Sequence, residues 1–131
     1  MISNISNSAS LSPIHIKALE ITSLSKLISK YLVYDLAPLR LNGKEDPNIY
    51  FSGDIVQQSN SLAPEIVNAE RKTFSEEKHQ HIVSLSHLTH DLYKNCERLE
   101  RSNSNGKEFL TLLRNELKKF KKLQHIWMLT L

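Results

Sequence analysis

The sequence predicts an all-α protein that ends in an antiparallel helical hairpin, and three observations predict it. Only three glycines and four prolines occur in 131 residues, so long stretches contain no helix breaker. Two of these stretches carry apolar residues at alternating spacings of three and four, which places the side chains on one face of a helix. A short polar segment that ends in Gly106 separates the two stretches and predicts a tight turn between them.

Length and composition allow one domain at most. Hydrophobic residues make up 40% of the chain, slightly less than in a typical compact globule. The single cysteine, Cys96, excludes an internal disulfide and a four-cysteine metal site. No apolar run approaches the length that crosses a bilayer, so we expect no membrane span. The net charge of +3 arises in residues 107–131, which hold six Lys or Arg and two Glu.

The first residues predict a disordered tail. Residues 1–14 contain no charged side chain and are rich in serine and asparagine, which compete for backbone hydrogen bonds. We therefore expect residues 1–20 to be disordered. The segment lacks the basic start and the continuous apolar core of a Sec signal peptide. It is either a floppy terminus or an export signal of the type III kind, which is uncharged, unfolded and rich in Ser, Asn and Ile.

Residues 21–64 predict a short helix followed by an extended arm. The helix is expected to begin near Thr22 or Ser23 and to end before Pro38, because the residue before a proline avoids the α region. Residues 38–64 contain several turn-forming pairs with Gly or Pro, which favours a linker or an arm. A short strand could form there, but the sequence offers no second strand to pair with it. The apolar face expected on the short helix consists of Leu24, Leu27, Ile28 and Tyr31.

Residues 65–131 predict the helical hairpin. One helix is expected from the start of this segment to Arg101 and a second from Glu108 to Leu129. Because the turn between them is short, the two helices should be antiparallel neighbours. The apolar seam expected on the first helix comprises Ile82, Leu85, Thr89, Leu92, Cys96 and Leu99. The seam expected on the second comprises Leu110, Leu113, Leu117, Phe120, Gln124 and Trp127.

The last helix carries more apolar surface than one neighbouring helix could cover. Four further residues widen its seam to more than a third of the circumference: Phe109, Leu112, Leu123 and Ile126. A helix with so wide a stripe needs contact on more than one side, and the rest of the chain offers few elements to provide it. We therefore expect a partner protein to complete the hairpin. The expected partner-binding residues are Leu85, Leu92, Leu99, Leu110, Leu113, Leu117, Phe120, Ile126 and Trp127.

The remaining polar motifs favour no catalytic, cofactor or metal chemistry. Of the four histidines between residues 79 and 90, only His87 and His90 have the helical spacing of metal ligands, whereas His79 and His81 do not face each other. The lysine run 118–122 is expected to offset the helix dipole and to keep the helix soluble rather than to bind nucleic acid. The sequence contains no Gly-rich phosphate loop, no Gly-x-Ser-x-Gly elbow and no carboxylate pair set in a cleft, so we expect no enzyme and no cofactor.

Three parts of the chain carry a resemblance to a known family. Between Ser12 and Ser29, the residues that fit the family's spacing are Ile14, Ile16, Leu19, Ser23, Leu24 and Leu27. The middle of the chain echoes the family's proline- and glycine-containing arm through Pro38, Leu39, Gly43, Pro47 and Tyr50. The apolar end from Leu123 to Leu131 looks like the family's C-terminus. Taken in this order, the chain resembles the YscX/SctX family of type III secretion, whose members are small exported components of about this length.

The resemblance implies a non-enzymatic role in a bacterial type III secretion apparatus. Members of the family are exported early in needle assembly. Before export, a small helical-repeat chaperone, YscY/SctY, holds them in the cytoplasm, and the pair docks on the cytosolic domain of the export gate. The resemblance further implies that the hairpin binds the chaperone and that residues 1 to about 14 are the signal. Two alternatives remain, a self-assembling rod or needle-type subunit and a small basic nucleic-acid-binding protein.

Overall fold

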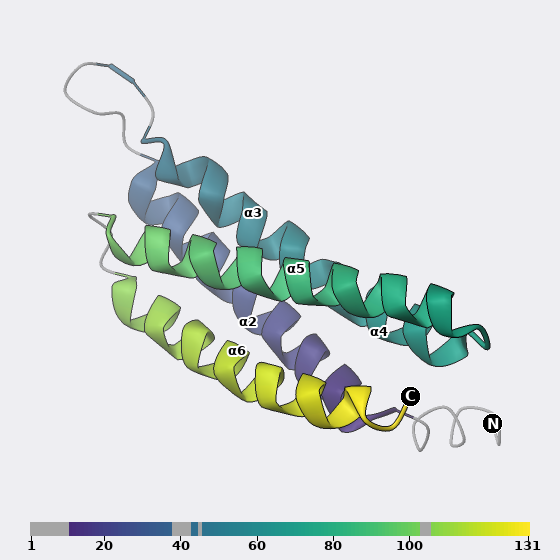
Figure 1. Cartoon of the computed structure of the whole chain (residues 1–131). Helices are drawn as coiled ribbons and strands as arrows, with labels where there is room; N and C mark the ends of the chain where they lie inside the picture. The colour runs from purple at the N-terminus through teal and green to yellow at the C-terminus, as the bar shows by residue number, and fades with distance from the viewer. Residues whose placement is uncertain (1–10, 38–42, 45, 103–105) are drawn as a thin grey trace, which may run out of the picture.

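The structure is a computed structural model that describes residues 11–37, 43–44, 46–102 and 106–131. Within those ranges, the elements are five α-helices and no strand: α2 (Pro13–Leu36), α3 (Asn48–Asn60), α4 (Leu62–Arg71), α5 (Ser75–Glu100) and α6 (Lys107–Met128). The predicted all-α class is confirmed, and so is the hairpin of the last two helices, which run side by side in opposite directions (Figure 1). No helix in the described part of the chain is long and apolar enough to cross a bilayer.

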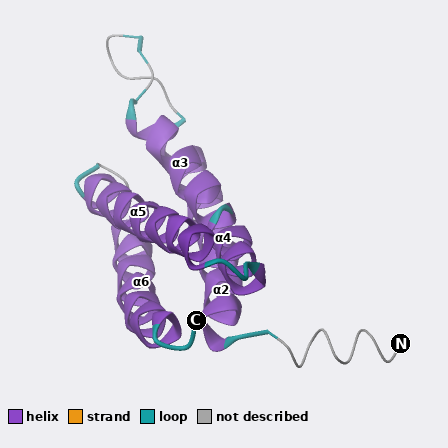
Figure 2. Ribbon diagram, turned by 45° about the vertical axis from the view of Figure 1, so that its right-hand side comes forward, coloured by secondary structure: helices purple, strands orange, loops and turns teal. Residues whose placement is uncertain are grey.

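The helices form an up-and-down bundle of four rods. One rod consists of α3 followed by α4 in the same direction, and the other three rods are α2, α5 and α6 (Figures 1 and 2). The α3–α4 rod and α6 each pack against both α2 and α5, whereas α2 and α5 lie diagonally opposite each other. Neighbours in the sequence are therefore neighbours in space, and α6 closes the ring by packing on α2. Each rod turns one face inward and one face outward.

The first helix is longer than the sequence predicted. It begins at Pro13 rather than near Thr22, so the prediction that residues 1–20 are a disordered tail is wrong from residue 13 onward, and residues 1–10 lie outside the described residues. Ser12 caps the helix, because its Oγ accepts a hydrogen bond from the backbone N–H of His15 at 3.4 Å. Proline at the first helical position has a backbone already suited to a helix. Ser12-Pro13 was the available sequence signal for this start.

The extended arm predicted for residues 38–64 is also wrong over most of its length. Helix α3 covers residues 48–60, and α4 begins at Leu62 after a single intervening residue. Asp46 holds the start of α3, where its Oδ1 accepts from the backbone N–H of Asn48 at 2.9 Å. Two buried serines of α3 donate their hydroxyl groups to backbone carbonyls of the preceding turn and so need no external partner. Pro38, Leu39 and Asn42 lie outside the described residues.

The single long helix predicted between residues 64 and 101 is divided into two. Lys72 and Phe74 have extended backbone conformations, and the chain reverses there, so that α4 and α5 pack against each other as a second hairpin. The segment contains no Gly or Pro to mark the reversal. Its weaker signals are the low helix propensity of Thr73 and Phe74 and the acidic pair Glu76 and Glu77, which suits the positive end of a helix dipole in the first turn of α5.

The core is built from the inward faces of all four rods. The predicted seams of α5 and α6 are buried except for Ile82, which is half-buried, and the core side chains of α2 step by three and four along the helix. Two serines, Ser25 and Ser29, occupy core positions of α2 and let the neighbouring rod approach closely. The chain itself therefore supplies the second side of contact that the wide stripe of α6 requires. The buried apolar residues of α2 are Ile14, Ala18, Ile21, Ile28, Leu32 and Leu36.

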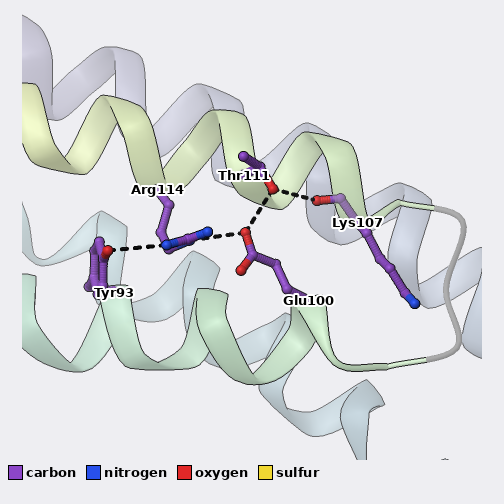
Figure 3. Close-up of polar contacts among 5 residues, drawn as sticks. All are labelled: Tyr93, Glu100, Lys107, Thr111 and Arg114. Carbon is purple, nitrogen blue, oxygen red and sulfur yellow. Dashed lines mark hydrogen bonds and ion pairs between the residues drawn. The ribbon is translucent and has the colours of Figure 1, made fainter.

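Polar contacts join α6 to each of the three other rods. Lys17 of α2 contacts Glu116 of α6 at 3.0 Å, and the indole Nε1 of Trp127 donates to Glu70 of α4 at 3.0 Å. Between α5 and α6, Glu100 accepts from the Arg114 Nε at 3.0 Å and from the Thr111 hydroxyl at 2.9 Å (Figure 3). These contacts help to fix the register of α6, because together they join positions from Thr111 to Trp127 to the three other rods.

The Glu116 carboxylate gives the fold a specific pH dependence. Hydrogen bonds from Lys119 and Lys17 lower its pKa below its ordinary value of 4.5. The stabilisation is therefore complete above the unfolded-state value and is lost as the pH falls through the lower folded-state pKa. We expect Glu116→Gln to cost up to about 1 kcal/mol at neutral pH. The difference in free energy of unfolding between wild type and variant should disappear at low pH in urea titrations. Asp91→Asn, at an exposed position, is the control and should show no such convergence.

Candidate partner-binding surface

The structure places the predicted partner-binding residues in the interior. Eight of the nine are buried in the core: Leu85, Leu92, Leu99, Leu110, Leu113, Leu117, Phe120 and Trp127. Only Ile126, which is 60% exposed, lies at the surface. The eight buried residues share the core with α2, α3 and α4. A partner could reach them only after one of the other rods had moved away.

A different apolar surface lies on the outward face of α2, on the side away from α5. Its centre is Leu27, which is 67% exposed. Tyr34, two helical turns further along α2, is 85% exposed. A groove of about 960 Å³ runs beside them and reaches Val56 of α3. Val33 lines the same groove. Side chains of this size are normally at least half covered, so this exposure marks a surface suited to protein contact.

A second hollow lies on the other side of Leu27, between α2 and α6. It has a volume of about 320 Å³, and its lining includes Phe109 and Leu112 of α6 together with Tyr31. The Tyr31 and Phe109 rings meet edge to face with their centroids 5.7 Å apart, which joins α2 to the start of α6. The two hollows with Leu27 between them form one apolar surface across three rods, here called the α2 surface. Its members are Leu24, Leu27, Tyr31, Val33, Tyr34, Val56, Phe109 and Leu112.

The charges at the α2 surface have one sign. Lys26 and Lys30 lie along the larger groove, and no Asp or Glu lines either hollow. Lys17, nearer the start of the helix, is neutralised by Glu20 and Glu116. The surface is therefore apolar at its centre and basic at one rim, which complements a partner with an apolar groove and an acidic edge.

The sequence predicted part of this surface as the apolar face of a short helix. Leu24, Leu27, Ile28 and Tyr31 were expected to lie together on that face. In the structure, Ile28 is buried, Leu24 is half-buried, and the other two are exposed. The core face is shifted around the helix, because it continues from a start at Pro13 and passes through Ser25. The exposure of Leu27 and Tyr34 could be predicted only once the start and the core face of α2 were known.

The motifs that could have carried metal chemistry are not brought together. Within the described ranges, no three His, Cys, Asp or Glu side chains gather closely enough to hold a metal ion. His81 instead pairs with Glu65 of α4, with 2.7 Å between its Nδ1 and the carboxylate oxygen. That contact joins the two helices of the α4–α5 hairpin.

Cys96 is inaccessible in the folded chain. The residue is fully buried, and burial raises the pKa of its thiol to about 12 from 9.0. A thiol reagent needs access to the thiolate, so the native thiol should react only when the bundle opens, at least about a thousandfold more slowly than the unfolded one, since folded-to-unfolded ratios of small domains are about 10³–10⁸. An Ellman assay in buffer and in concentrated guanidinium measures both rates. A native rate close to the unfolded rate would show that the α5 seam opens readily.

Comparison of the chain with models of protein families, with curated proteins and with solved structures finds no match.

Proposed function

We propose that this protein is a non-enzymatic export component that binds a helical-repeat chaperone through the α2 surface while its own bundle stays closed. The observation that supports this most directly is the outward face of α2, where Leu27 and Tyr34 stand exposed between two apolar hollows. Aromatic and aliphatic anchors at the centre of a patch are the residues that contribute most to protein–protein affinity.

The shape and charge of the α2 surface favour a concave helical partner. The outer face of a single helix is a convex ridge, which fits a groove formed between repeated helices. Because Lys26 and Lys30 lie on the rim of the α2 surface, we expect acidic residues at the edge of the partner's groove. A helical-repeat chaperone of the YscY/SctY kind, which the resemblance implies, supplies such a groove. The α2 surface takes over the binding role that the sequence assigned to the interior of the hairpin.

The resemblance also supplies the proposed setting, a bacterial type III secretion apparatus. The chaperone-bound protein would reside in the cytoplasm, dock on the cytosolic domain of the export gate and then be secreted. Most of the proposed export signal, residues 1–10 of about 14, lies outside the described residues. A deletion that tests the signal should end at residue 10, because Ser12 caps α2 and Ile14 is buried. Such a deletion should stop export and leave chaperone binding intact.

The proposal is tested by titrating the purified chain with the YscY/SctY-like chaperone of the same organism, using calorimetry. Leu27→Asp combined with Tyr34→Asp should weaken binding by about thirtyfold to a thousandfold, since two central anchors contribute of order 1–2 kcal/mol each. Phe74→Asp is the matched control, because Phe74 is 71% exposed and lies at the α4–α5 turn, away from the α2 surface. The control should bind like the wild type.

Unchanged chaperone affinity in the double variant would overturn the assignment of the α2 surface. Sedimentation of the chain alone separates the proposal from a self-assembling subunit. We expect a monomer. Concentration-dependent growth that Leu27→Asp abolishes would instead identify the occupant of the surface as a second copy of the chain.

A further inference from the structure

A second surface feature lies between α5 and α6, away from the α2 surface. It is a groove of about 280 Å³. The two motifs that the proposed function does not use, the histidines of α5 and the lysine run of α6, meet in it. His90 comes from α5, and Lys121 and His125 come from α6. The remaining lining residues are Ser86, Thr89, Gln124 and Met128.

The charged side chain of the groove, Lys121, differs from its neighbours on α6 in having no carboxylate partner among the described residues. Arg114, two turns before Lys121 on α6, is neutralised by Glu100 (Figure 3). Lys119 is likewise paired with Glu116 at 2.7 Å. No Asp or Glu lines the groove, and α6 has no acidic residue after Glu116. The potential in the groove is therefore positive, and it is not cancelled locally.

Polar atoms in the groove provide hydrogen-bond donors beside the Lys121 ammonium. Gln124 is only 7% exposed, and its Nε2 donates to the Ser86 hydroxyl oxygen at 2.8 Å. Because Ser86 accepts that bond, its own hydroxyl hydrogen can be donated, and the Gln124 amide retains a second N–H. Lys121 is held over the Tyr93 ring, with its Nζ 4.8 Å from the centroid. Thr89 adds no donor, since its hydroxyl already donates to the Leu85 carbonyl.

We propose that this groove binds a phosphate group, carried either by a soluble anion or by a lipid headgroup. A phosphate presents several acceptor oxygens and a charge greater than that of a carboxylate, which matches a site with one lysine, two imidazoles and two uncharged donors. The ammonium and imidazole groups approach from both helices, so the ligand would bridge α5 and α6. This inference does not depend on the proposed chaperone binding, because the groove and the α2 surface share no residue.

The test follows the imidazole proton signals of His90 and His125 by NMR in the full chain. One arm titrates inorganic phosphate, and the other adds phosphatidylcholine vesicles with and without phosphatidic acid. We expect both histidines to shift saturably in at least one arm, and the responding arm identifies the source of the phosphate group. Lys121→Ala should weaken the response about tenfold or more, as expected for loss of one charge-assisted contact. Lys119→Ala, which removes a paired lysine, should leave the response unchanged.

Two results would overturn the proposal. The first is the absence of a saturable shift at either histidine in both arms. The second is an equal response in the wild type and in Lys121→Ala, measured after thermal melting has shown that both are folded. In either case the lysine run would serve only to offset the α6 dipole and to keep the helix soluble.

Discussion

Leu117→Asp is expected to abolish cooperative folding of the isolated chain. Leu117 is fully buried in the α6 seam, and no described cationic side chain is placed in the core to neutralise a carboxylate there. Burying an unpaired charge costs several kcal/mol, in addition to about 2–5 kcal/mol for the lost leucine packing. That sum is comparable to the whole stability of a small domain, about 5–15 kcal/mol. Circular dichroism during a thermal scan measures the loss.

Leu112→Asp is the matched control for this experiment. It makes the same chemical change on the same helix, but Leu112 is half exposed on the outward side. Its effect on the free energy of unfolding should stay within about 0.5 kcal/mol. If the two variants melted alike, α6 would not be seated in the bundle as described.

Ile21→Asp is expected to be nearly as damaging, although it lies in a segment that the sequence did not assign to the core. Ile21 is fully buried on the inward face of α2, where α2 covers the hairpin that was predicted to need a partner. Leu27, six residues further on the same helix, points outward and is 67% exposed. Urea titrations of Ile21→Asp and Leu27→Asp should therefore differ by several kcal/mol in free energy of unfolding.

Equal, small effects of the two α2 variants would contradict the packing of α2 against the hairpin. They would restore the alternative in which the first helix is peripheral and a partner protein covers the α6 seam. Equal, large effects would mean instead that the outward face of α2 is also buried, for example in a dimer, and sedimentation would detect that state.

The part of the fold that the sequence predicted well is the hairpin of α5 and α6, where the apolar spacing is nearly continuous. Each seam places a core residue at every third or fourth position and contains one polar member, Thr89 in α5 and Gln124 in α6, so the antiparallel pairing could be predicted. The α2 core stripe is interrupted by Ser25 and Ser29, which are buried although they are polar. The same is true of Ser52 and Ser59 in α3. Periodicity alone misses such helices, because small serines fill core positions through close packing rather than through hydrophobicity.

The partner-binding surface could not be predicted for a related reason. Surplus apolar area on α6 shows only that the helix needs a second neighbour, and it does not show whether that neighbour belongs to the same chain. Once α2 and α3 are missed as core helices, the surplus is assigned to another molecule. Which apolar residues remain outside, such as Tyr34 and Leu27, depends on how α2 is rotated in the bundle. That rotation follows from packing across the whole core.

Equilibrium unfolding of the purified protein in urea shows whether this chain completes its own core. Trp127, at the end of α6, is 6% exposed and contacts Glu70 of α4, so its fluorescence reports the closed bundle. We predict a single cooperative transition for the chain without any partner, at the same urea concentration by fluorescence and by far-ultraviolet circular dichroism. A gradual loss of signal, or tryptophan emission that is solvent-exposed before the helices melt, would contradict it.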